Sequence, residues 1–354
     1  MYKDDKISKN SLPVDDLSGI WDESFYLLNN NNILITGASG FIGSWLVESL
    51  LFFRKSYELN ISLSILTRSK TSYLKKYPFI EKEKNFFIYE GNVINWVPPY
   101  GLFPDLIIHA ATDASARLNE ENPFLMFETI VGGTRNMLDL ACRASSKAFL
   151  MISSGATYGS PQNRMIKFSE NDLYGPDTTD PFFIYGESKR MAEILCSTIA
   201  KSFPIRIPVV RLFAFVGPRL PLDQHFAIGN FIHDALSHRS IKINGDGTPV
   251  RSYMYVGDLV KWLIKILLQG KSNNIYNVGS DEQISILDLA NTIAEFFTPK
   301  RQVEIKNIPR GSNPLNWYVP SIEKAKNEFG LSIETSLKDA VFKTIKWYER
   351  EING

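Results

Sequence analysis

Cysteine, histidine and long apolar runs are all scarce in this chain of 354 residues, which has only two cysteines and four histidines. Cys142 and Cys196 both lie in segments that we expect to be helical, where they suit small buried apolar side chains. They predict neither a disulfide framework nor a metal site. No apolar run is long enough to span a bilayer, and residues 1–10 lack the apolar core of a signal peptide.

An excess of either charge is also absent. Lysine and arginine total 39 and aspartate and glutamate total 38, which gives a formal net charge of +1. Such a balance gives no reason to expect binding to nucleic acid or to a membrane surface. The hydrophobic fraction of 44 % is that of an ordinary globular protein. We therefore expect a soluble, cytoplasmic protein.

Strand-like and helix-like stretches alternate along the chain, which predicts an α/β fold: a doubly wound parallel sheet of the Rossmann type with helices on both faces. After Pro218 the elements become shorter and mixed. We divide the chain into an N-terminal extension (1–31), a dinucleotide-binding domain (32–217) and a smaller α/β substrate lobe (218–354), with some crossing between the two. The expected strands are 33–36, 62–67, 86–89, 106–109, 148–153 and 208–213.

A β-branched, apolar run feeds a glycine-spaced turn in residues 33–43, ILITGASGFIG. Gly37 would allow the tight turn, Gly40 would let backbone approach a pyrophosphate, and Gly43 would let a helix pack on the strand. Phosphates would then lie at the N-terminus of a helix beginning near Phe41, where free N–H groups favour anions. A glycine-rich turn can also be only a turn, so both interpretations stand from this stretch alone.

Tyr185 and Lys189 are four residues apart and share one face of the helix expected over 187–200. An ammonium beside a phenol favours the phenolate, and a tyrosine with an ordinary pKa near 10 needs such help to act as an acid or base. An ordinary surface pair is the alternative. Upstream, an apolar stretch ends in Ser153 and Ser154, and hydroxyls at the carboxyl end of a parallel strand face the ligand crevice.

Together these motifs resemble those of the extended short-chain dehydrogenase/reductases, in particular the group of nucleotide-sugar epimerases, dehydratases and reductases. The resemblance runs from about Asn32 to the last helix. The matching motifs are TGASGFIG at 36–43, HAA at 109–111, Ser153-Ser154 with Tyr158-Gly159, Tyr185 with Lys189, RLFAFVGP at 211–218, 245–251, YVGDL at 255–259 and YNVG at 276–279.

The resemblance implies which residues hold a nicotinamide dinucleotide. In members that bind NAD, an acidic residue ends the second strand and binds the ribose hydroxyls. Here Thr67 takes that place and Arg68 follows, and an arginine there can pair with a 2′-phosphate. We therefore favour NADP(H) and keep NAD(H) as the alternative, with a solvated surface charge as the other interpretation of Arg68. The implied cofactor contacts are Gly37, Ser39, Gly40, Phe41, Ile42, Gly43, Arg68, Asn92, Val93, Ala110, Ala111, Tyr185, Lys189 and Phe213.

The resemblance also narrows the reaction. Dehydratases and decarboxylases of the family use acidic residues directly after the position of Ser154, whereas this chain has Gly155 and Ala156, which cannot transfer protons. With dehydration and decarboxylation disfavoured, the remaining reaction class of the family is hydride transfer at one carbinol. Ser154, Tyr185 and Lys189 are then the expected catalytic residues. Tyr185 would donate a proton to the carbonyl oxygen of a keto-sugar and Ser154 would bond the same oxygen. Lys189 would lower the pKa of Tyr185 and bond the nicotinamide ribose.

We therefore predict an NADPH-dependent 4-ketoreductase of a nucleotide-activated 4-keto-6-deoxyhexose in surface-polysaccharide biosynthesis. An example would be the conversion of dTDP-4-keto-6-deoxyglucose to a dTDP-6-deoxyhexose such as dTDP-fucose. Two alternatives stay open: an NAD-dependent nucleotide-sugar 4-epimerase, and a non-catalytic Rossmann protein that senses NADP(H). The presence of both Tyr185 and Lys189 argues against the sensor.

The substrate, a nucleotide-diphosphate sugar, would be held partly by Asn230 and Arg251, which match positions where the family binds the diphosphate. Arginine suits this role because its fork pairs with two phosphate oxygens. Surface ion pairs are the alternative for the arginines. By family habit, helices near 123–141 and 187–200 would pair with their copies in a homodimeric four-helix bundle, although both could equally be buried within one subunit. The predicted substrate-binding residues are Ser154, Thr157, His225, Asn230, Arg251 and Arg310, with no metal.

Overall fold

The computed structural model describes residues 10–112, 116–159, 167–224, 226–306 and 316–353. Within these ranges the chain forms two compact units. The first comprises residues up to 157 together with 177–211 and 260–276, and the second comprises 158–176, 212–259 and 277 onward. The chain therefore crosses between the units several times, and one crossing lies close to the domain boundary that the sequence places at 217.

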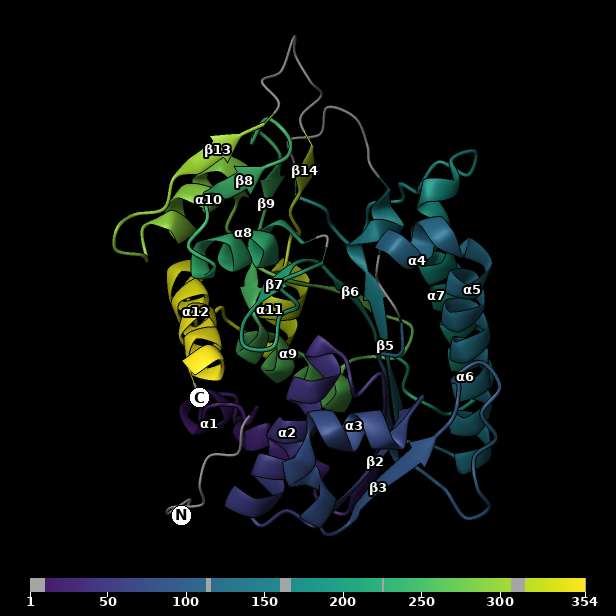
Figure 1. Cartoon of the computed structure of the whole chain (residues 1–354). Coiled ribbons are helices and arrows are strands. Elements are labelled where there is room, and N and C mark those ends of the chain that lie inside the picture. Colours follow the sequence, from purple (N-terminus) through teal and green to yellow (C-terminus); the bar gives the residue numbers. More distant parts are fainter. Residues whose placement is uncertain (1–9, 113–115, 160–166, 225, 307–315, 354) are drawn as a thin grey trace. The chain divides into compact units, whose positions relative to one another are not determined.

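A seven-stranded sheet forms the centre of the first unit, in the order β11-β6-β5-β4-β1-β2-β3 (Figure 1). The pairs β1/β2, β2/β3, β1/β4 and β4/β5 are parallel. The predicted Rossmann-type α/β fold is confirmed, because the strand order reverses between β1 and β4, where such sheets bind ligands. The strands are β1 (Asn31–Thr36), β2 (Ile61–Thr67), β3 (Phe86–Glu90), β4 (Leu106–His109), β5 (Ala148–Ser154), β6 (Val209–Leu212) and β11 (Ile275–Val278).

Helices cover the sheet of the first unit, and α5, α6 and α7 lie side by side (Figure 1). The single helix expected over 123–141 is in fact two helices joined by a π-helical turn at Glu128–Gly132. Glycine lets the start of α6 approach the turn after β3 closely, since a Cβ at Gly133 would lie 2.9 Å from Val93 Cγ1. The helices are α1 (Val14–Gly19), α2 (Phe41–Ser56), α3 (Lys70–Lys76), α4 (Ala116–Glu121), α5 (Pro123–Phe127), α6 (Gly133–Ala144), α7 (Ile184–Ser202) and α9 (Val256–Gln269), with 3-10 turns at Glu23–Leu28, Pro78–Lys82, Gly155–Tyr158 and Pro181–Phe183.

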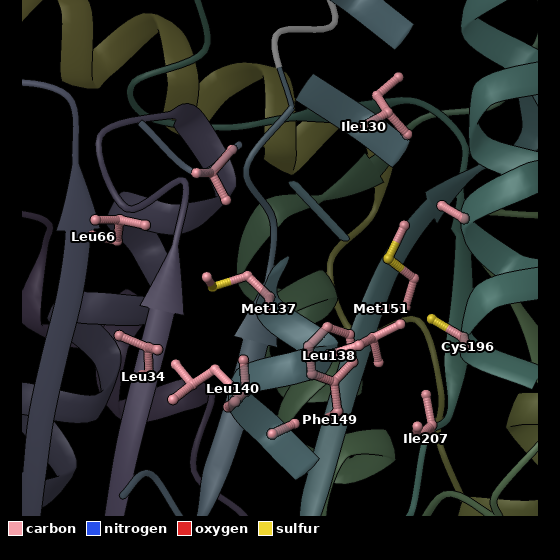
Figure 2. Packing of buried hydrophobic residues seen from close by; sticks show 14 of the residues in the cluster. Leu34, Leu66, Ile130, Met137, Leu138, Leu140, Phe149, Met151, Cys196 and Ile207 are labelled. Atoms are coloured by element: carbon pink, nitrogen blue, oxygen red, sulfur yellow. The ribbon is translucent and has the colours of Figure 1, made fainter. Parts of the chain in front are cut away.

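The core of the first unit lies between α6, α7 and the sheet (Figure 2). Leu34 of β1, Ile107 of β4 and Phe149 of β5 are each fully buried there. Runs of apolar residues form these strands because a parallel sheet that is covered on both faces has no side facing water. Burial on this scale fixes the strand ends, from which the functional side chains project.

The second unit is built from short strands and helices. In its aromatic centre Tyr158 stacks on Phe168 with 5.0 Å between ring centroids. Phe213 and Tyr318 form a tilted pair at 4.7 Å. Among the described residues, no helix has the length and apolar character needed to cross a bilayer. The elements are β7 (Phe215–Val216), α8 (Ala227–Leu236), β8 (Ile241–Ile243), β9 (Val250–Arg251), β10 (Met254–Tyr255), β12 (Ile284–Ser285), α10 (Ile286–Ala294), β13 (Val303–Ile305), β14 (Trp317–Tyr318), α11 (Glu323–Phe329) and α12 (Leu337–Asn353).

Candidate active site

The turn between β1 and α2 lies against the end of β4. Gly37 has φ of +74°, in the left-handed region that favours glycine. A Cβ at Gly37 would lie 2.5 Å from the carbonyl oxygen of Ala110, and a Cβ at Gly43 would collide with the carbonyl oxygen of Gly37. Gly40 is the N-cap of α2, and it offers no side chain to cap the first N–H groups of that helix. These groups can therefore meet an anion, as the sequence predicts.

A chain of hydrogen bonds joins the ends of β1 and β4. The backbone N–H of Ala111 donates to Thr36 Oγ1 at 3.1 Å, and the Thr36 hydroxyl lies 2.9 Å from His109 Nδ1. His109 Nε2 lies 3.1 Å from Thr134 Oγ1. Burial, with a smaller contribution from the charge of Lys189, lowers the pKa of His109 to about 3. A neutral ring can donate to one of these hydroxyls and accept from the other, and the Thr36 hydroxyl holds the segment after β4 beside the end of β1.

The structure brings the three predicted catalytic residues together at the end of β5. Tyr185 lies in the first turn of α7 and its side chain is hydrogen-bonded to Ser154. Lys189 follows one turn later, and its Nζ donates to the carbonyl oxygen of Ile152 at 2.7 Å and to Thr112 Oγ1 at 2.8 Å. Sequence reasoning did not identify Thr112, although it directly follows the HAA motif at 109–111.

Burial shifts the protonation of both α7 residues. Burial raises the pKa of Tyr185, and the hydrogen bond with Ser154 partly offsets that rise. Burial lowers the pKa of Lys189 to about 7, and the negative charge of Glu193 opposes that fall. The phenol of Tyr185 is therefore protonated and able to donate. The positive charge of Lys189 is present at acidic pH and is lost as the pH rises through about 7. An effect of that charge on Tyr185 stays a prediction.

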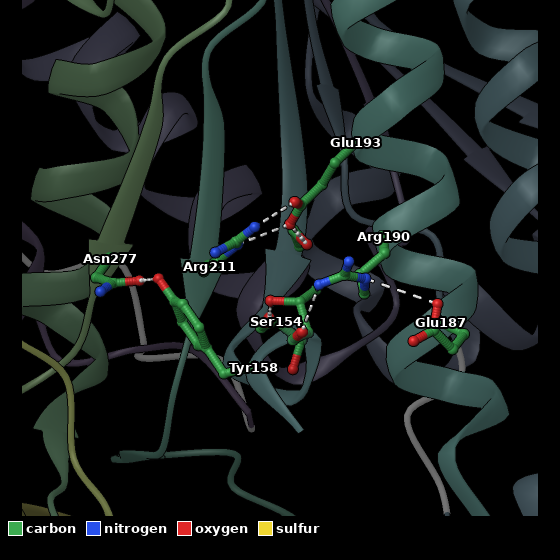
Figure 3. A network of polar contacts seen from close by, with 9 residues as sticks. Ser154, Tyr158, Glu187, Arg190, Glu193, Arg211 and Asn277 are labelled. Carbon is green, nitrogen blue, oxygen red and sulfur yellow. Dashed lines mark hydrogen bonds and ion pairs between the residues drawn. The ribbon is translucent and has the colours of Figure 1, made fainter. Parts of the chain in front are cut away.

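Figure 3 shows Glu193 and Arg211 in a buried polar network that the sequence reasoning missed. The carboxylate of Glu193 acts electrostatically on Lys189. Arg211 donates to Glu193 through Nε at 3.0 Å and through Nη2 at 2.7 Å. Ser153 Oγ donates to the same carboxylate at 2.5 Å. Glu193 and Arg211 are each only 8 % exposed. The signal for this network was the spacing of Tyr185, Lys189 and Glu193, which repeats every four residues and continues along one face of α7.

At the end of β2, Thr67 is buried and the side chain of Arg68 is exposed. The carboxylate of Glu90, which ends the adjacent β3, accepts the backbone N–H of Lys70 at 2.7 Å. This acidic group therefore binds the start of α3. Thr67 takes the place where we expect NAD-binding members to carry an acid, and the charged side chain of Arg68 directly follows it.

Three further predicted cofactor residues also lie in the first unit. Asn92 is exposed and its Oδ1 accepts the N–H of Ile94 at 3.1 Å. Val93 is buried against Gly133 at the start of α6. Ser39 is exposed in the glycine-rich turn, and its carbonyl accepts from Lys76 Nζ at 3.0 Å. Their roles toward a cofactor stay predictions.

Arg251, in β9 of the second unit, is bonded to backbone carbonyls. Its Nη1 donates to the carbonyl oxygens of Val250 at 2.8 Å and Asn316 at 3.0 Å, and its guanidinium lies 5.8 Å from the ring centroid of Tyr318. Burial lowers the pKa of Arg251. Within the described part of the chain, no carboxylate forms an ion pair with it. Such a guanidinium can bind an incoming phosphate without first breaking a salt bridge.

The other predicted substrate residues lie in different settings. Asn230 is half-buried on α8. Phe213, predicted as a cofactor contact, belongs to the aromatic centre of the second unit. Thr157 is fully buried and its hydroxyl donates to the carbonyl of Ser154 at 2.9 Å, which leaves a contact with substrate as a prediction only. His225 and Arg310 lie outside the described residues.

The first unit fits a nicotinamide dinucleotide. The backbone contact at Gly37 leaves no room for a Cβ, the first turn of α2 opens without a side-chain cap, and Tyr185 and Lys189 lie at the end of β5. These features suit a dinucleotide bound at the carboxyl edge of a doubly wound sheet. By the same placement, Gly40, Phe41 and Ile42 would meet the pyrophosphate.

Comparison with known proteins agrees with this geometry. The model of the NAD dependent epimerase/dehydratase family matches residues 33–279. UDP-glucuronic acid decarboxylase 6 of Arabidopsis thaliana is 31 % identical over 321 residues, which is 90 % of this chain and 89 % of that protein. UDP-glucose 4-epimerase of Thermotoga maritima superposes with a TM-score of 0.76 at 22 % identity, covering 91 % of this chain and 99 % of that one. A UDP-glucuronic acid 4-epimerase from Bacillus cereus gives 0.75 at 25 % identity, covering 90 % and 99 %.

Proposed function

Because the chain belongs to the NAD-dependent epimerase/dehydratase family, we propose that it is an NADPH-dependent 4-ketoreductase of a nucleotide-activated 4-keto-6-deoxyhexose. The observation that carries this proposal is the end of β5. Ser154 there meets Tyr185, while the two following residues, Gly155 and Ala156, bring no titratable group. Hydride transfer at one carbinol needs Ser154 and Tyr185, and it needs no acid or base at Gly155 or Ala156.

The chain's own residues can perform the proton side of this reaction. A bound nicotinamide dinucleotide would supply the hydride. Tyr185, protonated because burial raises its pKa, donates a proton to the carbonyl oxygen of the sugar. Ser154 bonds the same oxygen and stabilises its developing negative charge. Lys189, whose positive charge is present below about pH 7, favours the phenolate that remains.

We expect decarboxylases of the family to carry an acidic residue directly after the position of Ser154. This chain has Gly155 and Ala156 there. Elimination of water requires groups that take the proton from C5 and protonate the leaving hydroxyl, and loss of a carboxylate as CO2 leaves a carbanion that must then be protonated. Ala156 offers a methyl group, and its backbone N–H donates to Ser154 Oγ at 3.1 Å. The turn after β5 therefore orients Ser154 and adds no acid or base, which favours simple reduction.

A nucleotide-sugar 4-epimerase is the second candidate, because structural neighbours include UDP-glucose 4-epimerase and UDP-glucuronic acid 4-epimerase. Such an enzyme would hold NAD tightly and consume none. Purified protein mixed with dTDP-4-keto-6-deoxyglucose and NADPH distinguishes the two, with NADH in a parallel cuvette. Stoichiometric loss of NADPH absorbance supports the reductase. No loss, together with NAD released on denaturation, supports the epimerase.

The choice of NADP(H) is tested at Arg68. The Arg68→Asp substitution should weaken NADPH binding at least tenfold, because one charge-assisted bond to a 2′-phosphate contributes roughly 1.5–3 kcal/mol. NADH binding should change much less. Fluorescence titration of both dinucleotides measures this, with Arg143→Asp as the control because Arg143 is an exposed arginine on α6. Equal losses for NADPH and NADH would contradict the assignment.

The substrate diphosphate would bind Arg251 and Asn230 in the second unit. Arg251 supports this because its guanidinium is bonded to backbone carbonyls and, among the described residues, to no carboxylate. The proposed substrate is thus a nucleotide-diphosphate sugar whose charge lies on the phosphates.

We also propose that two copies of the chain pair through α5 and α7. Exposed apolar side chains on these helices support the proposal, namely Phe124 (80 % exposed), Ile194 (58 %) and Met191 (43 %). Ile194→Arg should convert a dimer to a monomer, because it places a charge where an apolar contact is expected. Sedimentation measures the mass, and Val97→Arg is the control because Val97 is 80 % exposed in a loop outside these helices. A wild-type monomer would contradict the proposal.

A further inference from the structure

Three consecutive residues of β5 are bonded to three residues on one face of α7. The carbonyl of Ile152 accepts from Lys189, and Ser153 donates to Glu193. The third bond is the one between Ser154 and Tyr185. One face of α7 thus carries the proton donor, a cation and an anion at intervals of four residues, and the strand end holds each of them in place.

Arg211 holds the carboxylate of Glu193 in place. It binds both oxygens of Glu193 from β6, and the two side chains share a site that is almost closed to water. Such a bidentate pair is a strong, directional charge-assisted contact. Ser153 supplies a further donor on the same side. Arg211 and Ser153 thus hold the carboxylate of Glu193 one helical turn from Lys189, whose ammonium it stabilises.

The surroundings of Lys189 offer few other charges. Thr112 and the carbonyl of Ile152 bind its Nζ without carrying any charge. His109 is neutral, because its pKa is about 3. Burial raises the pKa of the Cys196 thiol, so that this group is also neutral. The titratable groups that face Lys189 are thus Glu193, Cys196 and Tyr185 from α7 and His109 from β4, with Arg211 from β6 behind Glu193.

We propose that Glu193 and Arg211 are positioning residues which together set the charge of Lys189, Glu193 by stabilising the ammonium and Arg211 by limiting how strongly it does so. The inference rests on the proposed catalytic role of Lys189. Glu193 alone beside Lys189 would form a simple buried ion pair, and the ammonium would stay charged far into alkaline pH. With Arg211 bound to the carboxylate, Lys189 retains a titration midpoint near neutrality, where a group can change charge during turnover.

The two positioning residues should therefore move Lys189 in opposite directions. Glu193→Gln removes the carboxylate and should lower the pKa of Lys189 by about one unit or more. Arg211→Met leaves the carboxylate unbalanced and should raise it by about half a unit or more. Arg211→Lys retains a positive charge and should return the midpoint towards that of the unaltered protein. A merely structural role predicts loss of stability in each variant, with no opposite shifts.

The experiment is a carbon-13 NMR titration of the full chain labelled in its lysine side chains. Lys189 titrates well below ordinary lysines, whose pKa is about 10.4, and Lys189→Met identifies its signal. Neither cofactor nor substrate is needed. Opposite shifts in Glu193→Gln and Arg211→Met, with recovery in Arg211→Lys, support the inference. If Glu193→Gln does not fold, the two arginine variants carry the test.

An unchanged midpoint, or shifts in the same direction in every folded variant, would overturn the inference. The pH profile of kcat for reduction of the keto-sugar should follow the NMR midpoints. Shifts in the titration without any turnover of a nucleotide sugar would support the inference while contradicting the proposed function. Turnover of a nucleotide sugar with the same Lys189 titration midpoint in every variant would support the proposed function and contradict the inference.

Discussion

Replacing Tyr185 with phenylalanine should lower kcat for reduction of the keto-sugar by about a hundredfold to ten-thousandfold, the usual contribution of a positioned general acid. The substitution removes only the hydroxyl, so the ring still fills its place in the first turn of α7. Ser154 then remains as a hydrogen-bond donor to the sugar oxygen, but it cannot easily release a proton. The loss should therefore fall on kcat and leave NADPH binding within a few-fold.

Steady-state kinetics and a dinucleotide titration of Tyr185→Phe and of a control variant check this expectation. Tyr100→Phe is the matched control, because its ring is fully exposed in the loop between β3 and β4 and the same hydroxyl is lost. Turnover of Tyr185→Phe close to that of the unaltered protein would remove Tyr185 from the mechanism. A parallel loss of NADPH binding would indicate a role in the cofactor site instead.

The Gly37→Ala substitution should destabilise the first unit and abolish dinucleotide binding. Two physical terms act together. The left-handed backbone at φ +74° costs an L residue roughly 1–2 kcal/mol, and a Cβ held 2.5 Å from the carbonyl oxygen of Ala110 adds about 1–3 kcal/mol of overpacking. Backbone atoms on both sides cannot move aside as a flexible side chain could. The free energy of unfolding should therefore fall by roughly 2–5 kcal/mol.

Gly101→Ala separates the two terms. Gly101 has φ of +87°, but a Cβ there would meet nothing within 4 Å. It should therefore show the backbone cost alone, about 1–2 kcal/mol. Denaturant unfolding of both variants measures the difference, and NADPH titration measures binding. Equal stability losses at Gly37 and Gly101 would mean that the contact with Ala110 is not as close as the structure has it.

Six of the seven strands of the sheet were predictable because each is a local apolar run, whereas β11 (Ile275–Val278) was not among the expected strands. The run before Gly37, the run that ends at His109 and the run that ends at Ser154 are apolar stretches which close in turn residues, and all three are strands of the sheet. Their ends agree with the prediction to within one or two residues. The glycine-rich turn was predictable for the same reason, since its chemistry lies within eleven consecutive residues.

Contacts between distant segments were harder to predict. Glu193 and Arg211 are separated by 18 residues, and Ser153 lies 40 residues before Glu193. Neither residue belongs to a recognised catalytic pair, and a charged residue on a helix usually faces water. The π-helical turn after α5 was not predicted for a different reason. The apolar pattern of Glu128–Gly132 does not differ from that of an ordinary α-helix.

The interpretation of Ser153-Ser154 as one motif also needed the fold. The two adjacent hydroxyls have different partners, although both partners lie on the same face of α7. Ser153 binds Glu193, while Ser154 meets Tyr185. The sequence predicted the chemistry of the second and gave no separate role to the first.

The central claim is net hydride transfer from NADPH to C4 of a nucleotide-activated keto-sugar. Incubating the protein with dTDP-4-keto-6-deoxyglucose and NADPH deuterated at the transferred position tests it most directly. The account predicts one deuterium at C4 of the product for each NADPH oxidised, seen by NMR as loss of the C4 proton signal. A product without deuterium and without NADPH oxidation, alongside interconversion of intact nucleotide sugars by protein-bound NAD, would contradict it.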